Sequence, residues 1–213
     1  MAASAMGRKR ERHSAMLRAA LSYAARGVPV FPCEPSGKRP LTANGFWDAT
    51  TDRALIRGWW GRWPEANVGV PTGRASGLLV LDVDAAEGLE SIAELELLLG
   101  QAPPTARAIT GRGGEHLYFR APSDVEVRNS AGFLGAGLDV RGEGGYVIVP
   151  PSRTAQAYRC VERSPPPGGL PGCSGAWKSG HARRRGKRCS ESARAAAAIA
   201  PATCPAPRSS RRR

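Results

Sequence analysis

The sequence contains no run of eighteen or more apolar residues. A helix needs about 20 consecutive apolar residues to cross a bilayer, so a membrane-spanning segment is excluded. Residues 1–13 are basic, but the stretch that follows is amphipathic and is interrupted by Arg18. It lacks the continuous apolar core of a secretory signal, and we therefore expect a cytoplasmic protein.

Cysteine is also scarce, with five residues at irregular spacing and no C-x-x-C pair. An odd number without a regular pattern argues against a disulfide framework, and we expect Cys33, in the folded part, to be a thiol. The remaining candidates for a zinc site are Cys173, His181, Cys189 and Cys204. We interpret these four as scattered residues of a tail, because zinc sites use closely paired ligands.

Acidic residues are outnumbered, 18 Asp and Glu against 31 Lys and Arg, which gives a net charge of +13. The excess lies at the two ends. Residues 1–13 carry a net charge of +3 and residues 161–213 a net charge of +10, whereas residues 14–160 are neutral. A strongly basic protein usually has a polyanionic partner such as nucleic acid. Here that inference has to come from motifs, because the central part carries no excess charge.

Apolar periodicity predicts a mixed α/β or α+β domain over residues 14–163. Helices are expected at 14–26, at 52–60 with Thr51 as cap and Leu55 and Trp59 on one face, and at 85–99 with Gly100 as its end. Strands are expected at residues 28–31, 67–70, 77–83, 107–110, 115–120, 138–141 and 146–149.

The segment after residue 163 differs in kind from the domain before it. Residues 164–213 are rich in Pro, Gly, Arg and Ala and have no apolar periodicity, so we predict a disordered basic tail. The composition is typical of GC-rich DNA translated in a wrong frame. The alternative is a genuine tail that adds non-specific DNA affinity through phosphate contacts.

Two carboxylates end the most apolar strand. Residues 77–83 form a continuous apolar run, typical of a buried central strand, and Asp82 and Asp84 alternate onto the same face of it. Adjacent carboxylates repel each other unless a cation lies between them, and Mg²⁺ or Mn²⁺ prefers such oxygen ligands. A D-x-D pair alone is common, and by itself favours two aspartates that cap the next helix.

Two further strands carry polar residues next to glycine turns. His116 follows Gly113 and Gly114 and shares a strand face with Tyr118 and Arg120, and Asp139 shares a face with Arg141. Glycines allow the backbone to approach a phosphate closely, and His and Arg can bind its oxygens. One histidine on a strand is more often structural. Polar residues next to glycine turns on several strands, however, favour a common functional site.

The ordered set D-x-D, G-G-x-H-x-Y-F and G-x-D-x-R-G-x-G-G-Y-x-x-x-P-P-S resembles the prim-pol domain of the archaeo-eukaryotic primase superfamily. Residues 19–32, 37–40, 48–51, 59–60, 64–69 and 72–73 also agree with it. The likeness covers about residues 14–163 and stops near Ser164, where relatives continue into a Trp-Leu helix and often a helicase. It implies an RNA-recognition-like catalytic β-core with an additional N-terminal α/β unit.

The resemblance also implies residue roles. Asp82, Asp84 and Asp139 are the expected metal-binding acids, and His116 the expected contact to the nucleotide's phosphates. Other expected triphosphate or template contacts are Arg141, Lys38 and, in a turn where relatives have a small residue, Arg112.

The implied activity is template-dependent nucleotidyl transfer with two Mg²⁺ or Mn²⁺ ions, by a primase/polymerase acting in plasmid, phage or mobile-element replication. Expected partners are a single-stranded DNA template, NTP or dNTP, and a helicase domain or protein. Two alternatives remain open at this point. One is an inactive remnant that binds nucleotide or DNA, and the other is a metal-dependent nuclease.

Overall fold

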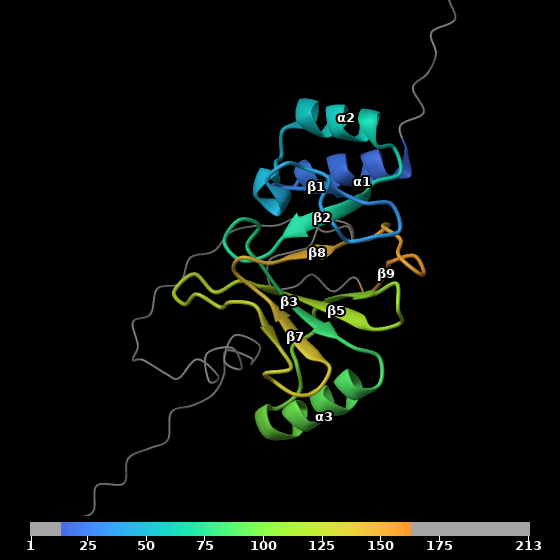
Figure 1. The fold of residues 1–213 in the computed structure, drawn as a ribbon. Coiled ribbons are helices and arrows are strands. Elements are labelled where there is room, and N and C mark those ends of the chain that lie inside the picture. The colour runs from blue at the N-terminus through green and yellow to red at the C-terminus, as the bar shows by residue number, and fades with distance from the viewer. Residues whose placement is uncertain (1–13, 163–213) are drawn as a thin grey trace, which may run out of the picture.

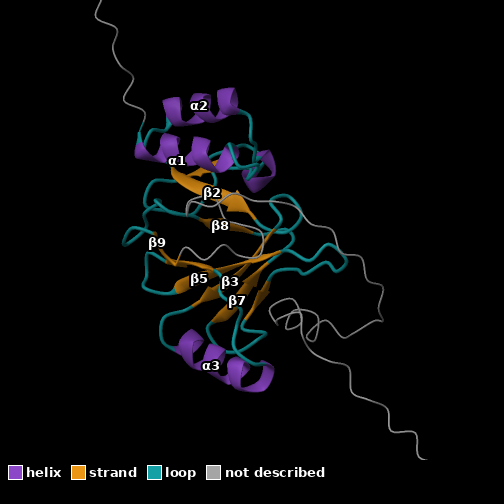
Figure 2. Cartoon of the chain, turned by 180° about the vertical axis from the view of Figure 1, so that it is seen from behind, coloured by secondary structure: helices purple, strands orange, loops and turns teal. Residues whose placement is uncertain are grey.

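The computed structural model describes residues 14–162. The predicted N-terminal extension, residues 1–13, and the predicted tail, residues 164–213, lie outside the described residues. The described chain forms four layers (Figure 1): helices α1 and α2, a three-stranded sheet, a six-stranded sheet, and helix α3 on the far side. Figure 2 shows the same order of layers from behind.

Helices α1 (Ala15–Ala24) and α2 (Arg53–Arg62) form the outer layer at one end. The helix predicted at 14–26 is confirmed, with Ser14 as its cap. At α2 the predicted cap was wrong by one residue: the Asp52 carboxylate accepts the first free backbone N–H groups, as a capping side chain does. The predicted inner face was wrong as well, because Ile56 and Trp60 are buried and Leu55 is 53% exposed.

Helix α3 (Glu87–Leu99) covers the opposite side of the molecule. It ends where predicted, at Gly100, whose φ of 87° suits a residue without a Cβ atom. Ile92 and Leu95 pack against the six-stranded sheet. Leu89 and Leu99 of the same helix are about half exposed.

All ladders between the named strands are antiparallel, which selects α+β over α/β among the two predicted classes. The smaller sheet has the order β1-β2-β8. Its strands are β1 (Phe31–Cys33), β2 (Asn67–Pro71) and β8 (Tyr146–Ile148). The larger sheet has the order β6-β7-β3-β5-β4-β9. Its strands are β6 (Ser130–Ala131), β7 (Leu138–Arg141), β3 (Leu78–Val83), β5 (Glu115–Arg120), β4 (Ala106–Ile109) and β9 (Arg159–Glu162).

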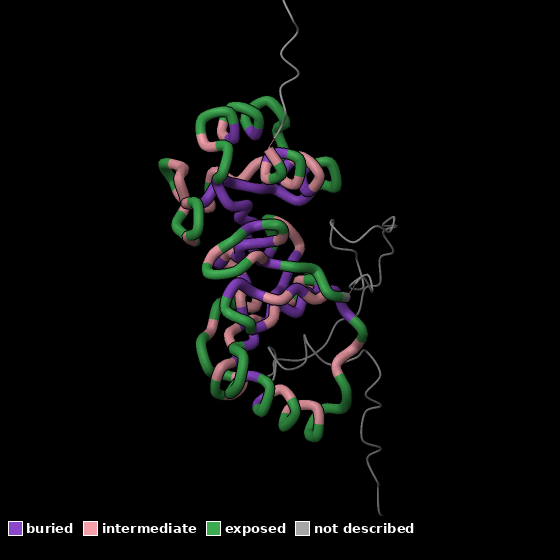
Figure 3. The backbone as a smooth tube through the Cα atoms, turned by 90° about the vertical axis from the view of Figure 1, so that its right-hand side faces the viewer, coloured by how far each residue is buried: buried purple, intermediate pink, exposed green. Residues whose placement is uncertain are grey.

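Strand β3 lies inside the larger sheet, as its apolar sequence predicts. Its residues alternate between two cores. Leu79, Leu81 and Val83 pack in the core that α3 covers, whereas Leu78 and Val80 join the core shared with α1, α2 and the smaller sheet. Asp82 lies on the same face of β3 as Leu78 and Val80. In Figure 3 the buried backbone runs through the middle of the molecule and the helices at both ends are largely exposed.

Three elements were not expected from the sequence: strands β6 and β9 and the 3₁₀ helix η1 (Gly45–Asp48). All three are four residues long or shorter, too short for a periodic pattern. The strand predicted at 28–31 begins three residues later, as β1. Val28 and Val30 are nevertheless buried, so their apolar character reflects packing.

Candidate active site

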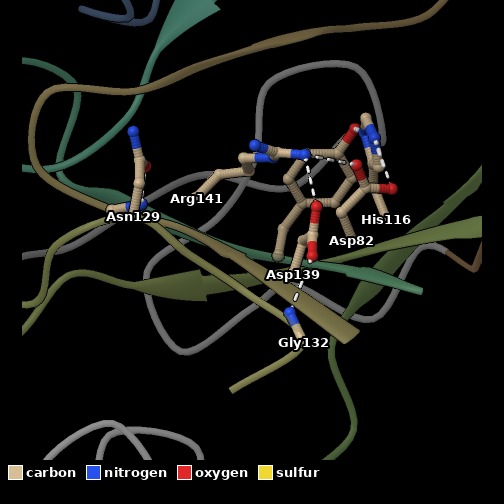
Figure 4. A network of polar contacts seen from close by, with 8 residues as sticks. Asp82, His116, Asn129, Gly132, Asp139 and Arg141 are labelled. Carbon is tan, nitrogen blue, oxygen red and sulfur yellow. Dashed lines mark hydrogen bonds and ion pairs between the residues drawn. The ribbon is translucent and has the colours of Figure 1, made fainter. Parts of the chain in front are cut away.

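The register of three strands brings the three predicted motifs together. Asp82 of β3 lies opposite His116 of β5 on one side and opposite Asp139 of β7 on the other. Directly opposed residues of an antiparallel pair have neighbouring side chains on the same face. Residues that are up to 57 positions apart in sequence therefore meet on one face of the larger sheet (Figure 4).

Arg141 links the two carboxylates. One guanidinium nitrogen, Nη2, lies 2.7 Å from Asp139 Oδ2 and 3.5 Å from Asp82 Oδ2 (Figure 4). The backbone N–H of Gly132 donates to the other oxygen of Asp139, Oδ1, at 3.1 Å. Two carboxylates from neighbouring strands thus converge on a single cationic atom, and Asp139 is held at both of its oxygens.

His116 is 2% exposed and bridges between Asp82 and Tyr118. Its Nε2 lies 3.4 Å from Asp82 Oδ1, and its Nδ1 lies 3.3 Å from the Tyr118 hydroxyl. A carboxylate only accepts hydrogen bonds, so Nε2 carries the proton that faces Asp82. In the neutral ring, Nδ1 then accepts from the Tyr118 hydroxyl. Asp82 therefore fixes the proton on Nε2, and Tyr118 holds the ring at its other nitrogen.

The electrostatics of the site keep Asp82 ionised. Burial by itself raises the pKa of Asp82, but the hydrogen bond with His116 and the charges of His116, Lys38 and Arg141 outweigh burial and hold the pKa below its ordinary value. Burial raises the pKa of Tyr118 well above its ordinary value. The site thus pairs an anionic carboxylate with a phenol that stays protonated.

A cavity of about 240 Å³ opens above this network. Predicted residues that line it are Lys38, Asp82, His116 and Arg141. Its other walls are Asn129, Gly144, Gly145, Tyr146, Val147 and Ile148. The cavity therefore lies between the two sheets, with cationic, anionic and aromatic groups facing one space.

Asn129 and Tyr146 were not predicted as site residues. The Asn129 amide oxygen accepts from the Gly142 N–H at 2.9 Å, and the amide sits so close to Gly145 that a Cβ atom there would overlap it. In the sequence, the adjacent glycines Gly144 and Gly145 could have indicated that a side chain approaches the backbone there. Nothing in the sequence around Asn129 indicates which backbone it contacts.

Asp84 and Arg112 lie outside this cavity lining. Asp84 follows the end of β3 and is exposed, and its backbone N–H donates to the Gly137 carbonyl at 2.8 Å. Arg112 is exposed in the turn between β4 and β5. In that turn a Cβ atom on Gly114 would collide with the Val83 carbonyl, so this glycine allows the hairpin to pack against the end of β3.

The donor set fits a hard divalent cation in part. Within residues 14–162, no three His, Cys, Asp or Glu side chains are arranged as a ready ligand set. Asp82 and Asp139 do present oxygens to one common point, which the Arg141 guanidinium occupies. Carboxylate oxygens in that arrangement are what Mg²⁺ or Mn²⁺ binds.

The fold and site define a mixed α/β domain with a cavity between two antiparallel sheets that is lined by a carboxylate, a histidine and two cationic side chains. The sequence profile of the family "bifunctional DNA primase/polymerase, N-terminal" matches residues 20–173. The chain belongs to this family, as its motifs predicted. No curated protein matches the sequence significantly. No helix in the described part of the chain is long and apolar enough to cross a membrane.

Proposed function

We propose that this chain is a template-dependent nucleotidyltransferase that makes or extends DNA primers in plasmid, phage or mobile-element replication. The observation that carries the proposal is the strand register, which sets Asp82 between His116 and Asp139 beside a cavity that also contains Lys38 and Arg141. Acids next to cations in one cavity are what transfer of a phosphoryl group requires, because the chemistry depends on charge neutralisation and positioning.

Each side chain has a role in this proposal. Lys38 and Arg141 bind phosphate oxygens of the incoming nucleotide, and the guanidinium can do so with two parallel hydrogen bonds. His116 would redirect its Nε2–H, which faces Asp82 in the structure, to a phosphate oxygen, while Tyr118 holds the ring at Nδ1. Tyr146 lines the cavity from strand β8.

Asp82 and Asp139 are the proposed ligands of Mg²⁺ or Mn²⁺, and Asp84, at the exposed end of the same strand, completes the set of acids. Bound divalent cations would neutralise the triphosphate and lower the pKa of the attacking hydroxyl. The chain's own contribution is to keep Asp82 anionic and to hold Asp139 beside it, and a bound cation would take the place of the Arg141 guanidinium between the two carboxylates.

The proposal is tested by one assay with three readouts. The full chain is incubated with single-stranded DNA, labelled NTP or dNTP, and Mg²⁺ or Mn²⁺, and the products are resolved by length. New or extended strands support the proposal. Shortened template without incorporation indicates a metal-dependent nuclease, and nucleotide or DNA binding without any product indicates an inactive remnant. Either of these two results contradicts the proposal.

A further inference from the structure

A second cavity, of about 440 Å³, adjoins the catalytic one. Its lining includes Phe46 and Trp47 from η1, Thr50 and Thr51 from the following loop, and Glu143. Gly144 lines both cavities. The two spaces therefore share a wall at the turn that enters strand β8.

A row of aromatic rings leads from solvent to the catalytic cavity. Trp47 is 72% exposed, and its ring centroid lies 4.5 Å from that of Phe46 at an interplanar angle of 34°. Phe46 lies 5.6 Å from Tyr146 at 31°, and Tyr146 lines the catalytic cavity. An exposed tryptophan at the outer end of such a row leaves a free face on which a planar group can stack.

The turn that carries Trp47 is held in place before any ligand binds. The two carboxylate oxygens of Asp48 accept from the backbone N–H and the side-chain amide of Asn44, both at 2.9 Å. The Thr42 hydroxyl donates to the Gly45 carbonyl at 2.6 Å. These bonds fix both ends of the four-residue helix, so a stacking partner does not have to order it.

The charges of the two cavities differ. Lys38 and Arg141 face the catalytic cavity, which suits phosphate. Among the described residues that line the second cavity, Glu143 is the one with an ionisable side chain, and its carboxylate accepts from the Arg74 N–H at 2.8 Å. An anionic wall disfavours phosphate, whereas aromatic rings and threonine hydroxyls suit an uncharged nucleobase with polar edges.

We propose that an unpaired base of single-stranded DNA stacks on Trp47 beside the catalytic cavity, with its phosphates outside. The inference rests on the proposed function, which makes a DNA strand the partner. A free nucleotide is the less suitable occupant, because its triphosphate would have to enter a space that offers a carboxylate and no cation. Stacking on an aromatic face tolerates any base, as a template-reading protein requires.

Binding of a fluorescently labelled thymidine 15-mer to the full chain, measured by anisotropy without nucleotide or divalent metal, tests the inference. Loss of one stacked base should raise the Kd for Trp47→Ala about tenfold or more. Trp47→Phe should retain most of the affinity. Leu97→Ala is the matched control, since it removes an 88% exposed apolar side chain from α3, and it should bind as wild type does.

A 15-mer with abasic sites separates base stacking from phosphate contacts. Wild type should bind it as weakly as Trp47→Ala binds the thymidine 15-mer, and the dependence of Kd on salt should be the same for both proteins, because phosphate contacts are unchanged. The thermal unfolding midpoint of Trp47→Ala should equal that of wild type, because the side chain is exposed.

Three results would overturn the inference: a wild-type Kd for Trp47→Ala, equal affinity of wild type for abasic and thymidine DNA, or a raised KM for nucleotide with an unchanged Kd for DNA. Because binding is measured without catalysis, failure of the proposed function is a separate result. If the chain makes no product but its DNA binding still depends on Trp47, the proposed polymerase activity is contradicted and the stacking site is supported.

Discussion

The two faces of the six-stranded sheet come from the same strands and differ in chemistry around Asp82. On one face, Leu79, Leu81 and Val83 of β3 pack with apolar residues of β5 and β7 beneath α3. On the other face, Asp82 takes its place beside Val80, one residue away from Leu81 in sequence. Its neighbours there are His116, Asp139 and Arg141.

This difference shows how one strand can serve stability and chemistry at once. The apolar face packs against helix α3, so its contribution is burial. The other face is closed by a second sheet that leaves a cavity, and there the carboxylates are balanced by a cation and by hydrogen bonds. A buried charge is tolerated only when it is compensated in this way.

Among substitutions on the two faces of the sheet, we expect the largest effect from one on the charged face. Asp139→Asn keeps the shape of the side chain and removes its charge, so we expect nucleotide incorporation to fall on the order of a hundredfold or more. Steady-state incorporation on a primed template measures this. Asp124→Asn, at an exposed loop position, is the control and should keep wild-type activity.

The opposite face should respond in the opposite way. Leu81→Ala leaves a cavity beneath α3 and should lower the free energy of unfolding by about 2–5 kcal/mol. Urea denaturation measures the loss, and the kcat of the protein that remains folded should stay close to that of wild type. A large fall in kcat with unchanged stability would show that the two faces are not separate.

Tyr118 should contribute less than the carboxylates of the charged face, because it acts through His116. Tyr118→Phe removes one hydrogen bond, worth about 0.5–1.5 kcal/mol, so incorporation should fall about twofold to tenfold. Because His116 is the proposed phosphate contact, the loss should appear mainly as a raised KM for nucleotide, with the thermal unfolding midpoint close to that of wild type. A wild-type KM in Tyr118→Phe would remove the positioning role from Tyr118.

The smallest effect concerns the apolar residues behind the cavity. Burial raises the pKa of the Cys33 thiol from its ordinary 9.0 to about 12, and Glu34 adds to the shift. Between these values the unfolded chain loses the proton and the folded chain keeps it, so stability should fall as pH rises above 9.0. In Cys33→Ala this part of the decline should vanish.

Thiol alkylation gives the matching readout at lower pH. The native protein should react with iodoacetamide at Cys33 far more slowly than the urea-unfolded protein, and mass spectrometry of the peptide containing Cys33 distinguishes this site from the other cysteines. Equal rates would show that water in the cavity reaches the thiol.

Much of this arrangement could be predicted from the sequence, because alternation along β3, β5 and β7 determines which side chains share a face. The motif order identified Asp82, His116, Asp139 and Arg141, and the structure brings these four together. Lys38, predicted from a loop, also reaches the cavity. Residues on strands were therefore predictable, since alternation along a strand orients them.

Other features depend on contacts that periodicity does not encode. The inner face of α2 was wrong by one residue, because packing against α1 and β1 and not the apolar pattern selects Ile56. Asn129 and Trp47 lie in short irregular segments. Their positions follow from hydrogen bonds to Gly142 in one case and from the capped turn of η1 in the other.

The proposed nucleotidyl transfer depends above all on Asp82, the carboxylate between His116 and Asp139. The most direct measurement compares wild type with Asp82→Asn in Mg²⁺ or Mn²⁺, by incorporation of labelled nucleotide on a primed single-stranded template and by thermal unfolding of the same samples. We expect template-dependent incorporation by wild type and none above background by Asp82→Asn, which remains folded. Undiminished incorporation by folded Asp82→Asn would rule out this role for Asp82.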